Sequence, residues 1–186
     1  TRRSSDLKLI DAATGKVRDE ICPPEDVAGG TFWKWMALDG DTLYAVVGEQ
    51  EMKDEMKRWK RDQHGWPWNA ISPGYNVQEQ PWGYGRNVLA IDVQTKKVIW
   101  HHHEQEPIDT RAVCMSDGQL YAFRFGSFLT CLDTATGNVR WRKTQEDDPQ
   151  LFESMGTYLP RQGWQTNWRT AAYMKCSQEA LYFAGT

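Results

Sequence analysis

The chain has 186 residues and a formal net charge of −3, from 22 basic and 25 acidic residues. This balance gives no basic field of the kind that nucleic-acid binding requires, so a nucleic-acid partner is not expected. No apolar run approaches the roughly 20 residues of a transmembrane segment, and no charged-then-apolar leader opens the sequence. Because the sequence starts at Thr1 without a methionine, we expect a processed product or a piece of a longer chain.

The first strand pair is predicted within residues 7–20, LKLIDAATGKVRDE, and two later segments repeat its pattern. The copies are residues 88–101 (VLAIDVQTKKVIWH) and 128–143 (FLTCLDTATGNVRWRK). Each has an apolar strand ending in Asp, then Thr, a glycine-type turn position and a second short strand. The three aspartates are Asp11, Asp92 and Asp133. The last two are 41 residues apart and the first two 81 apart, so the unit recurs with a period near 40 residues.

A second kind of strand pair alternates with the first. Residues 31–48 contain two apolar segments around Asp39-Gly40, which is a hairpin signal. Residues 110–126 and 167–185 repeat this pattern, and a Leu-Tyr pair recurs in all three copies. Each period therefore holds four short strands, which we call A and B for this hairpin and C and D for the Asp-Thr-Gly hairpin. Four antiparallel strands per period are typical of a propeller blade.

The best copy of the turn comprises Asp133, Thr136, Gly137, Val139 and Trp141. This pattern resembles the blade repeat of the pyrroloquinoline-quinone-like, or quinoprotein-type, β-propellers. That family includes quinone-dependent alcohol dehydrogenases and a non-enzymatic outer-membrane assembly lipoprotein. The resemblance implies an all-β fold, a partial β-propeller of four-stranded antiparallel blades, in an extracytoplasmic bacterial setting, periplasmic or secreted.

Two positions depart from the family pattern. Lys96 occupies the glycine position of the second copy, and Asp19 occupies the tryptophan position of the first. These departures predict weaker packing between the blades concerned.

The strand count predicts C and D of one blade, two complete blades, and A and B of a fourth. Residues 1–186 would then be part of a single propeller domain. Because propellers close with about 4 to 8 blades, the missing blades must come from the rest of a larger chain or from another chain.

The meander places all A–B and C–D turns on one face, which we call the short-turn face, and all B–C and D–A connections on the other, the long-loop face. The expected D–A connections are residues 21–31, 102–110 and 144–166, and one B–C connection is an insertion of residues 49–86. Loops on a rigid scaffold usually carry function, so the long-loop face is the candidate site.

The insertion combines a predicted helix with an aromatic loop. Residues 49–61 place Met52, Met56 and Trp59 on one stripe, which predicts a short amphipathic helix. Its stripe either packs on the propeller or binds a partner. The remainder carries Trp66, Trp68 and Trp82, which either stack on a sugar or another planar ligand or hold the loop together.

Three cations are predicted near the start of the innermost strands, at the mouth of the central channel. These are Lys34, Arg111 and Arg169. Together they would suit an anionic ligand with several carboxylates. The alternative is local pairing, for example of Arg111 with Asp109.

Metal chemistry is weakly indicated. His101, His102 and His103 are adjacent and cannot all face one way from a strand, so we interpret them as a solvated strand end. The four cysteines, Cys22, Cys114, Cys131 and Cys176, have no zinc spacing. Cys131 and Cys176 align with apolar positions of the other repeats and are interpreted as small core residues.

Two functional hypotheses follow. The first is a non-catalytic propeller module that binds a protein or an extracellular small-molecule ligand on its long-loop face. It is favoured because no nucleophile-base pair or metal cluster is evident in the sequence. The second, implied by the resemblance, is a dehydrogenase of alcohols or sugars that uses pyrroloquinoline quinone and calcium. The adjacent cysteine pair often found in those enzymes is absent from this sequence.

Overall fold

The computed structural model describes residues 6–24, 26–27, 30–48, 83–156 and 173–184. Its elements in chain order are β1 (Leu7–Ile10), β2 (Val17–Ile21), β3 (Phe32–Asp39), β4 (Thr42–Gly48), β5 (Tyr84–Asp92), β6 (Val98–Asp109), the 3-10 turn η2 (Thr110–Ala112), β7 (Val113–Ser116), β8 (Gln119–Arg124), β9 (Phe128–Asp133), β10 (Val139–Thr144), the helix α2 (Pro149–Ser154), β11 (Tyr173–Cys176) and β12 (Leu181–Ala184).

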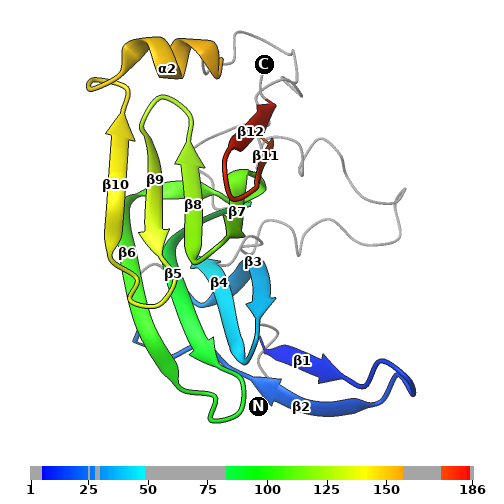
Figure 1. Cartoon of the computed structure of the whole chain (residues 1–186). Coiled ribbons are helices and arrows are strands. Elements are labelled where there is room, and N and C mark those ends of the chain that lie inside the picture. Colours follow the sequence, from blue (N-terminus) through cyan, green and yellow to red (C-terminus); the bar gives the residue numbers. More distant parts are fainter. Residues whose placement is uncertain (1–5, 25, 28–29, 49–82, 157–172, 185–186) are drawn as a thin grey trace, which may run out of the picture.

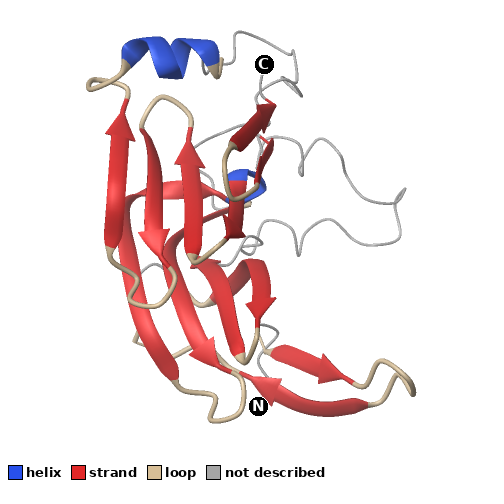
Figure 2. Cartoon of the chain, viewed as in Figure 1, coloured by secondary structure: helices blue, strands red, loops and turns tan. Residues whose placement is uncertain are grey.

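The strands form two four-stranded antiparallel sheets flanked by two hairpins (Figures 1 and 2). The sheets have the orders β3-β4-β5-β6 and β7-β8-β9-β10, and the hairpins are β1-β2 and β11-β12. We call these units, in chain order, the first (β1-β2), second (β3 to β6), third (β7 to β10) and fourth (β11-β12) blades. The predicted fold class is confirmed: the chain is all-β and forms part of a β-propeller.

The Asp turn between strands C and D is built by one side chain. Asp133 Oδ1 accepts hydrogen bonds from the backbone N–H groups of Ala135 and Thr136, both at 2.9 Å. The N–H of Gly137 donates to the Asp133 carbonyl at 2.8 Å, and Gly137 has a φ of 73°. A left-handed residue is required at this point, which explains the glycine. Lys96 adopts the same conformation at the equivalent position of the second blade, with a φ of 60°.

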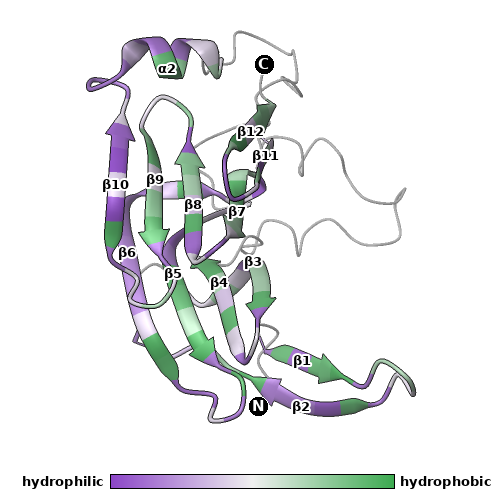
Figure 3. Ribbon diagram, in the orientation of Figure 1, coloured by the Kyte–Doolittle hydropathy of each residue, from purple (hydrophilic) through white to green (hydrophobic). Residues whose placement is uncertain are grey.

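Apolar side chains fill the layers between neighbouring blades. Val46 and Val88 of the second blade pack with Phe128 of the third. Phe123 of the third blade packs edge-to-face on Phe183 of the fourth, with ring centroids 4.9 Å apart. The middle strands are therefore buried and apolar, whereas the outer strand β10 is exposed and mostly hydrophilic (Figure 3).

Two features differ from the predictions. The expected connection 102–110 is wrong, because β6 continues to Asp109 and η2 then leads directly into β7. The strand includes Pro107, which is tolerated because β6 is an outer strand of its sheet.

The helix α2 was not predicted. It starts at Pro149, is capped by Asp148, which accepts from the Leu151 N–H at 3.2 Å, and buries Phe152. The helix predicted at residues 49–61, like most of the 49–86 insertion, lies outside the described residues.

Candidate functional site

The two kinds of connection lie on opposite faces of the blades, as predicted. On the short-turn face, the C–D turn of each complete blade is joined to the A–B turn: the Val93 N–H donates to the Asp41 carbonyl at 2.9 Å, and the Thr134 N–H to the Gly118 carbonyl at 3.1 Å. On the long-loop face, the Thr110 N–H donates to the Gly83 carbonyl at 3.0 Å. The loops that differ from blade to blade therefore emerge from one side of a rigid scaffold.

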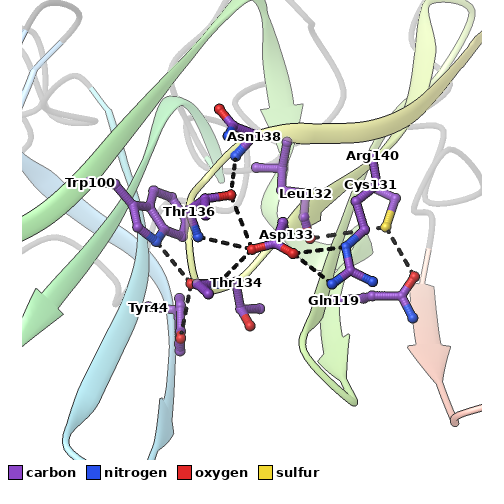
Figure 4. Close-up of polar contacts among 11 residues, drawn as sticks. Tyr44, Trp100, Gln119, Cys131, Leu132, Asp133, Thr134, Thr136, Asn138 and Arg140 are labelled. Carbon is purple, nitrogen blue, oxygen red and sulfur yellow. Dashed lines mark hydrogen bonds and ion pairs between the residues drawn. The ribbon is translucent and has the colours of Figure 1, made fainter.

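A tryptophan joins the second and third blades. The ring of Trp100, from β6, lies over Gly137, where an added Cβ would be 2.6 Å from Cε3 of the indole. The indole Nε1–H donates to the Thr134 carbonyl at 2.9 Å, and the Tyr44 hydroxyl donates to the same oxygen at 3.2 Å (Figure 4). The glycine thus serves two purposes, since it supplies the left-handed conformation and leaves room for the indole.

The joint between the first and second blades contains an ion pair in place of the tryptophan contact. Asp19 and Lys96, the two residues that depart from the repeat, form an ion pair with Nζ 2.5 Å from Oδ1. They occupy the positions that Trp100 and Gly137 occupy at the next joint. The two departures are therefore coupled, and an exposed ion pair replaces the tryptophan contact.

Trp141 of the third blade repeats the arrangement of Trp100. The rings of Tyr121 and Trp141 lie 6.0 Å apart at 48°, and those of Tyr44 and Trp100 lie 6.0 Å apart at 46°. Trp141 is 38% exposed. Its conformation is thus the one that Trp100 uses to receive the turn of a following blade.

The predicted cations Lys34 and Arg111 lie on neighbouring innermost elements at the long-loop face. Lys34 is on β3, beside Gly48 at the end of β4, and β3 contacts η2, which carries Arg111. Arg111 is bound by Asp109: its Nε donates to Oδ1 at 2.8 Å and its Nη2 to Oδ2 at 2.6 Å. The alternative of local pairing is correct for this residue.

Burial and charge act against each other in this pair. Burial would lower the pKa of Arg111, but the hydrogen bonds and charge of Asp109 more than compensate and raise it. Burial raises the pKa of Asp109, and the bonds from Arg111 oppose this change. The bidentate contact therefore stabilises the charged forms of both groups in a site from which water is largely excluded.

Charged residues missed by the sequence analysis lie beside this pair. The Tyr84 hydroxyl is 3.3 Å from Arg111 Nη2. Arg124, at the end of β8, donates to the Pro107 carbonyl at 3.0 Å and pairs with Glu106 at 3.3 Å. These contacts join β5, β6 and β8 at the long-loop face, and no local motif marks them in the sequence.

The remaining predicted ligand-binding residues are Trp66, Trp68, Trp82 and Arg169, and all of them lie outside the described residues. Their placement at the site stays a prediction.

The histidines are not at a strand end, contrary to our interpretation, but in the middle of β6. They alternate between the two faces, as expected. His101 and His103 each contact Asn87 Oδ1 at 2.8 Å, whereas His102 contacts Glu104 at 3.0 Å. Within the described ranges, no group of three or more His, Cys, Asp and Glu side chains is arranged to hold a metal ion.

Glu104 joins the second and third blades at their outer strands. Arg142 Nη1 of β10 lies 2.8 Å from each of its carboxylate oxygens. Burial would raise the pKa of Glu104, but the hydrogen bonds from His102 and Arg142 outweigh burial and lower it. The carboxylate is thus an ionised structural contact between blades.

These contacts define the class of protein. Four-stranded antiparallel blades packed face to face, with a tryptophan of one blade seated on the Asp turn of the next, make this chain part of a β-propeller. In the part of the chain that the structure describes, no helix has the length and apolar character needed to cross a membrane.

Comparisons with known proteins agree with the sequence motif. No family model matches the chain. It is similar to the quinoprotein alcohol dehydrogenase PedE of Pseudomonas putida, with 25% identity over 125 residues, and to a quinoprotein ethanol dehydrogenase of Pseudomonas putida, with 23% identity over 124 residues. Each match covers 66% of this chain and 19% of the relative, so the chain spans about a fifth of their length.

Among solved structures, BamB from Moraxella catarrhalis matches 98% of this chain and 41% of its own, with 14% identity and a TM-score of 0.46. The repeated Asp-turn motif and the two curated relatives together support a quinoprotein-like β-propeller fragment.

Proposed function

We propose that this propeller is a non-catalytic module that binds a protein or an extracellular small molecule on its long-loop face. The separation of the connections supports this proposal. The short turns are hydrogen-bonded to each other on one face, while the long connections leave from the other. A rigid scaffold that varies its loops on one side is the usual architecture of a recognition surface.

Within this face, we propose separate roles for the cations and the aromatic residues. Lys34, Arg111 and Arg169 would surround the channel mouth and favour an anionic ligand, with Arg111 oriented by Asp109. Trp66, Trp68 and Trp82 would supply stacking area. The contact between β3, which carries Lys34, and η2, which carries Arg111, is the structural support for the first role.

A pull-down with the full-length protein tests the proposal. The partner is identified by mass spectrometry, purified and titrated against the protein. The combined variant Trp66→Ala, Trp68→Ala and Trp82→Ala should abolish binding while leaving the melting temperature nearly unchanged. Lys97→Ala, an exposed change on the short-turn face, is the matched control and should bind normally. A triple variant that binds normally, or whose fold collapses, would refute the role given to these rings.

The second candidate is a pyrroloquinoline-quinone-dependent dehydrogenase of alcohols or sugars. The two curated relatives favour it, since both are named as quinoprotein dehydrogenases. The described residues provide no carboxylate set suited to calcium, so we assign no residue to the quinone or the ion. The test is dye reduction by the full-length protein with pyrroloquinoline quinone, calcium and alcohols or aldoses. Turnover would replace the module proposal, and its absence would remove the enzyme.

We also propose that Trp141 receives the Asp-x-x-x-Gly turn of strands C and D of the fourth blade, supplied by the rest of a longer chain or by another chain. The support is that its geometry with Tyr121 matches that of Trp100 with Tyr44. In the full-length protein, a bromide quencher of indole fluorescence should then not reach Trp141. Quenching that Trp141→Phe removes would contradict the proposal. By analogy with the relatives we propose an extracytoplasmic location, which cell fractionation tests.

A further inference from the structure

Two cysteines from neighbouring blades meet in the apolar layer between the third and fourth blades. Cys114 lies on β7 and Cys176 on β11, and these two innermost strands contact each other (Figure 1). Cys114 belongs to the cluster that contains Phe123 and Met174, and Cys176 packs against the same cluster. The Cys176 thiol is also near enough to raise the pKa of the Cys114 thiol.

The two cysteines differ in their exposure to solvent. Cys114 is buried, whereas Cys176 is half-buried and open to solvent on one side. Both strands are held in antiparallel pairs, with Cys114 opposite Tyr121 and Cys176 opposite Leu181. The backbone therefore holds the two cysteines on contacting strands, and Cys176 is the one that an oxidant in solution reaches more easily.

We propose that Cys114 and Cys176 are a site of oxidative cross-linking, in which a small-molecule disulfide converts the thiol pair into a disulfide that joins the third and fourth blades. In the first step the Cys176 thiolate attacks one sulfur of the oxidant, forming a mixed disulfide and releasing one small thiol. In the second step the Cys114 thiolate attacks the Cys176 sulfur and releases the second small thiol. The protein loses two electrons and two protons, and the oxidant takes up both.

The second step should depend on pH. Burial raises the pKa of the Cys114 thiol, the nearby Cys176 thiol raises it further, and the positive charge of Lys175 opposes this rise. The thiolate is the attacking species, so the cross-linking rate should rise about tenfold per pH unit up to that pKa. Cross-linking during folding, before the layer is packed, should be faster than in the folded protein.

The other two cysteines are internal controls. Cys131 is also buried, but its Sγ donates to Gln119 Oε1 at 3.4 Å, from the neighbouring strand of its own sheet. Cys22 is exposed, and its Sγ donates to Asp6 at 3.3 Å. Cys22 should form a mixed disulfide with the oxidant, and Cys131 should stay reduced.

The experiment treats the folded protein with excess oxidised glutathione at about pH 8.5, followed by alkylation and peptide mapping without reduction. We expect one cross-linked peptide pair containing Cys114 and Cys176. The melting temperature should rise by about 5–10 °C, reversibly with dithiothreitol. Cys131→Ser should give the same cross-link, whereas Cys176→Ser should give none and show no rise.

Two outcomes would overturn the proposal. One is that Cys114 and Cys176 both remain alkylatable after Cys22 has reacted completely. The other is that glutathione stays on Cys176 as a stable mixed disulfide. Both outcomes are measured on the natural sequence, so they do not depend on the folding of any variant.

Discussion

The contact between Gly137 and Trp100 can be tested by adding one methyl group. In Gly137→Ala, the new Cβ would lie 2.6 Å from Cε3 and 2.7 Å from Cδ2 of the indole, at a φ of 73°. Gly118→Ala, in the other turn of the same blade, is the matched control. Its φ is 71°, and its Cβ would meet only Thr134 Oγ1 at 3.8 Å. The two variants therefore share the backbone strain and differ in the clash.

The shared strain of a left-handed alanine costs about 1–2 kcal/mol. Only in Gly137→Ala must the indole move away. The hydrogen bond from Trp100 to the Thr134 carbonyl is then lost, at a cost of about 0.5–1.5 kcal/mol. The ring contact with Tyr44 is lost as well, at a similar cost of about 0.5–1.5 kcal/mol. Gly137→Ala should thus lower the free energy of unfolding by about 1–3 kcal/mol more than Gly118→Ala.

The assay is urea unfolding followed by circular dichroism, with both substitutions also made in a Trp100→Ala background. There the difference between the two glycine variants should disappear, because the indole that causes the clash is gone. Equal destabilisation by the two variants with Trp100 present would refute the docking explanation.

Three further predictions concern charged contacts. The pair Asp19→Trp with Lys96→Gly should rebuild the tryptophan joint and raise the melting temperature, because an exposed ion pair contributes little and the tryptophan adds buried aromatic area. Calorimetry that shows no gain for the pair over the single variants would contradict this. Arg111→Ala should lower the free energy of unfolding by about 3–5 kcal/mol, because it leaves the buried carboxylate of Asp109 unpaired. In urea unfolding, the double variant Asp109→Asn with Arg111→Ala should recover part of this free energy. The pKa of Glu104 is lowered on folding, so the ionised carboxylate stabilises the folded protein fully above the ordinary glutamate pKa, and this stabilisation is lost as the pH falls through the lower folded value. Glu104→Gln should therefore flatten the acid dependence of the melting temperature. An unchanged acid profile would show that Glu104 is not the source of this dependence.

The fold was predictable because its signals are local. The Asp-x-x-Thr-Gly turn specifies its own hydrogen bonds within a few residues, as Asp133 shows with Ala135 and Thr136. The ion pair between Asp19 and Lys96 was not predicted, because it joins residues 77 positions apart. Each residue alone looked like a defect in the repeat, and only the packing of the blades shows that one compensates for the other.

The candidate site was predictable only in part. The alignment of repeats correctly placed Lys34 and Arg111 near the start of the innermost strands. The length of β6 was misjudged: its second half contains Pro107 and several charged residues, all of which an outer strand accepts. Asp109 was recognised as a local partner, but Tyr84 and Arg124 reach the same region from other strands, and no sequence spacing indicates that.

We propose that recognition takes place on the long-loop face. Hydrogen–deuterium exchange of the full-length protein, with and without its purified partner, tests it most directly. We expect added protection at Gly83 and Tyr84, at residues 110–112 and at residues 125–127, all on that face. Protection confined to the Asp turns at residues 11–16, 93–97 and 134–138 would contradict the account.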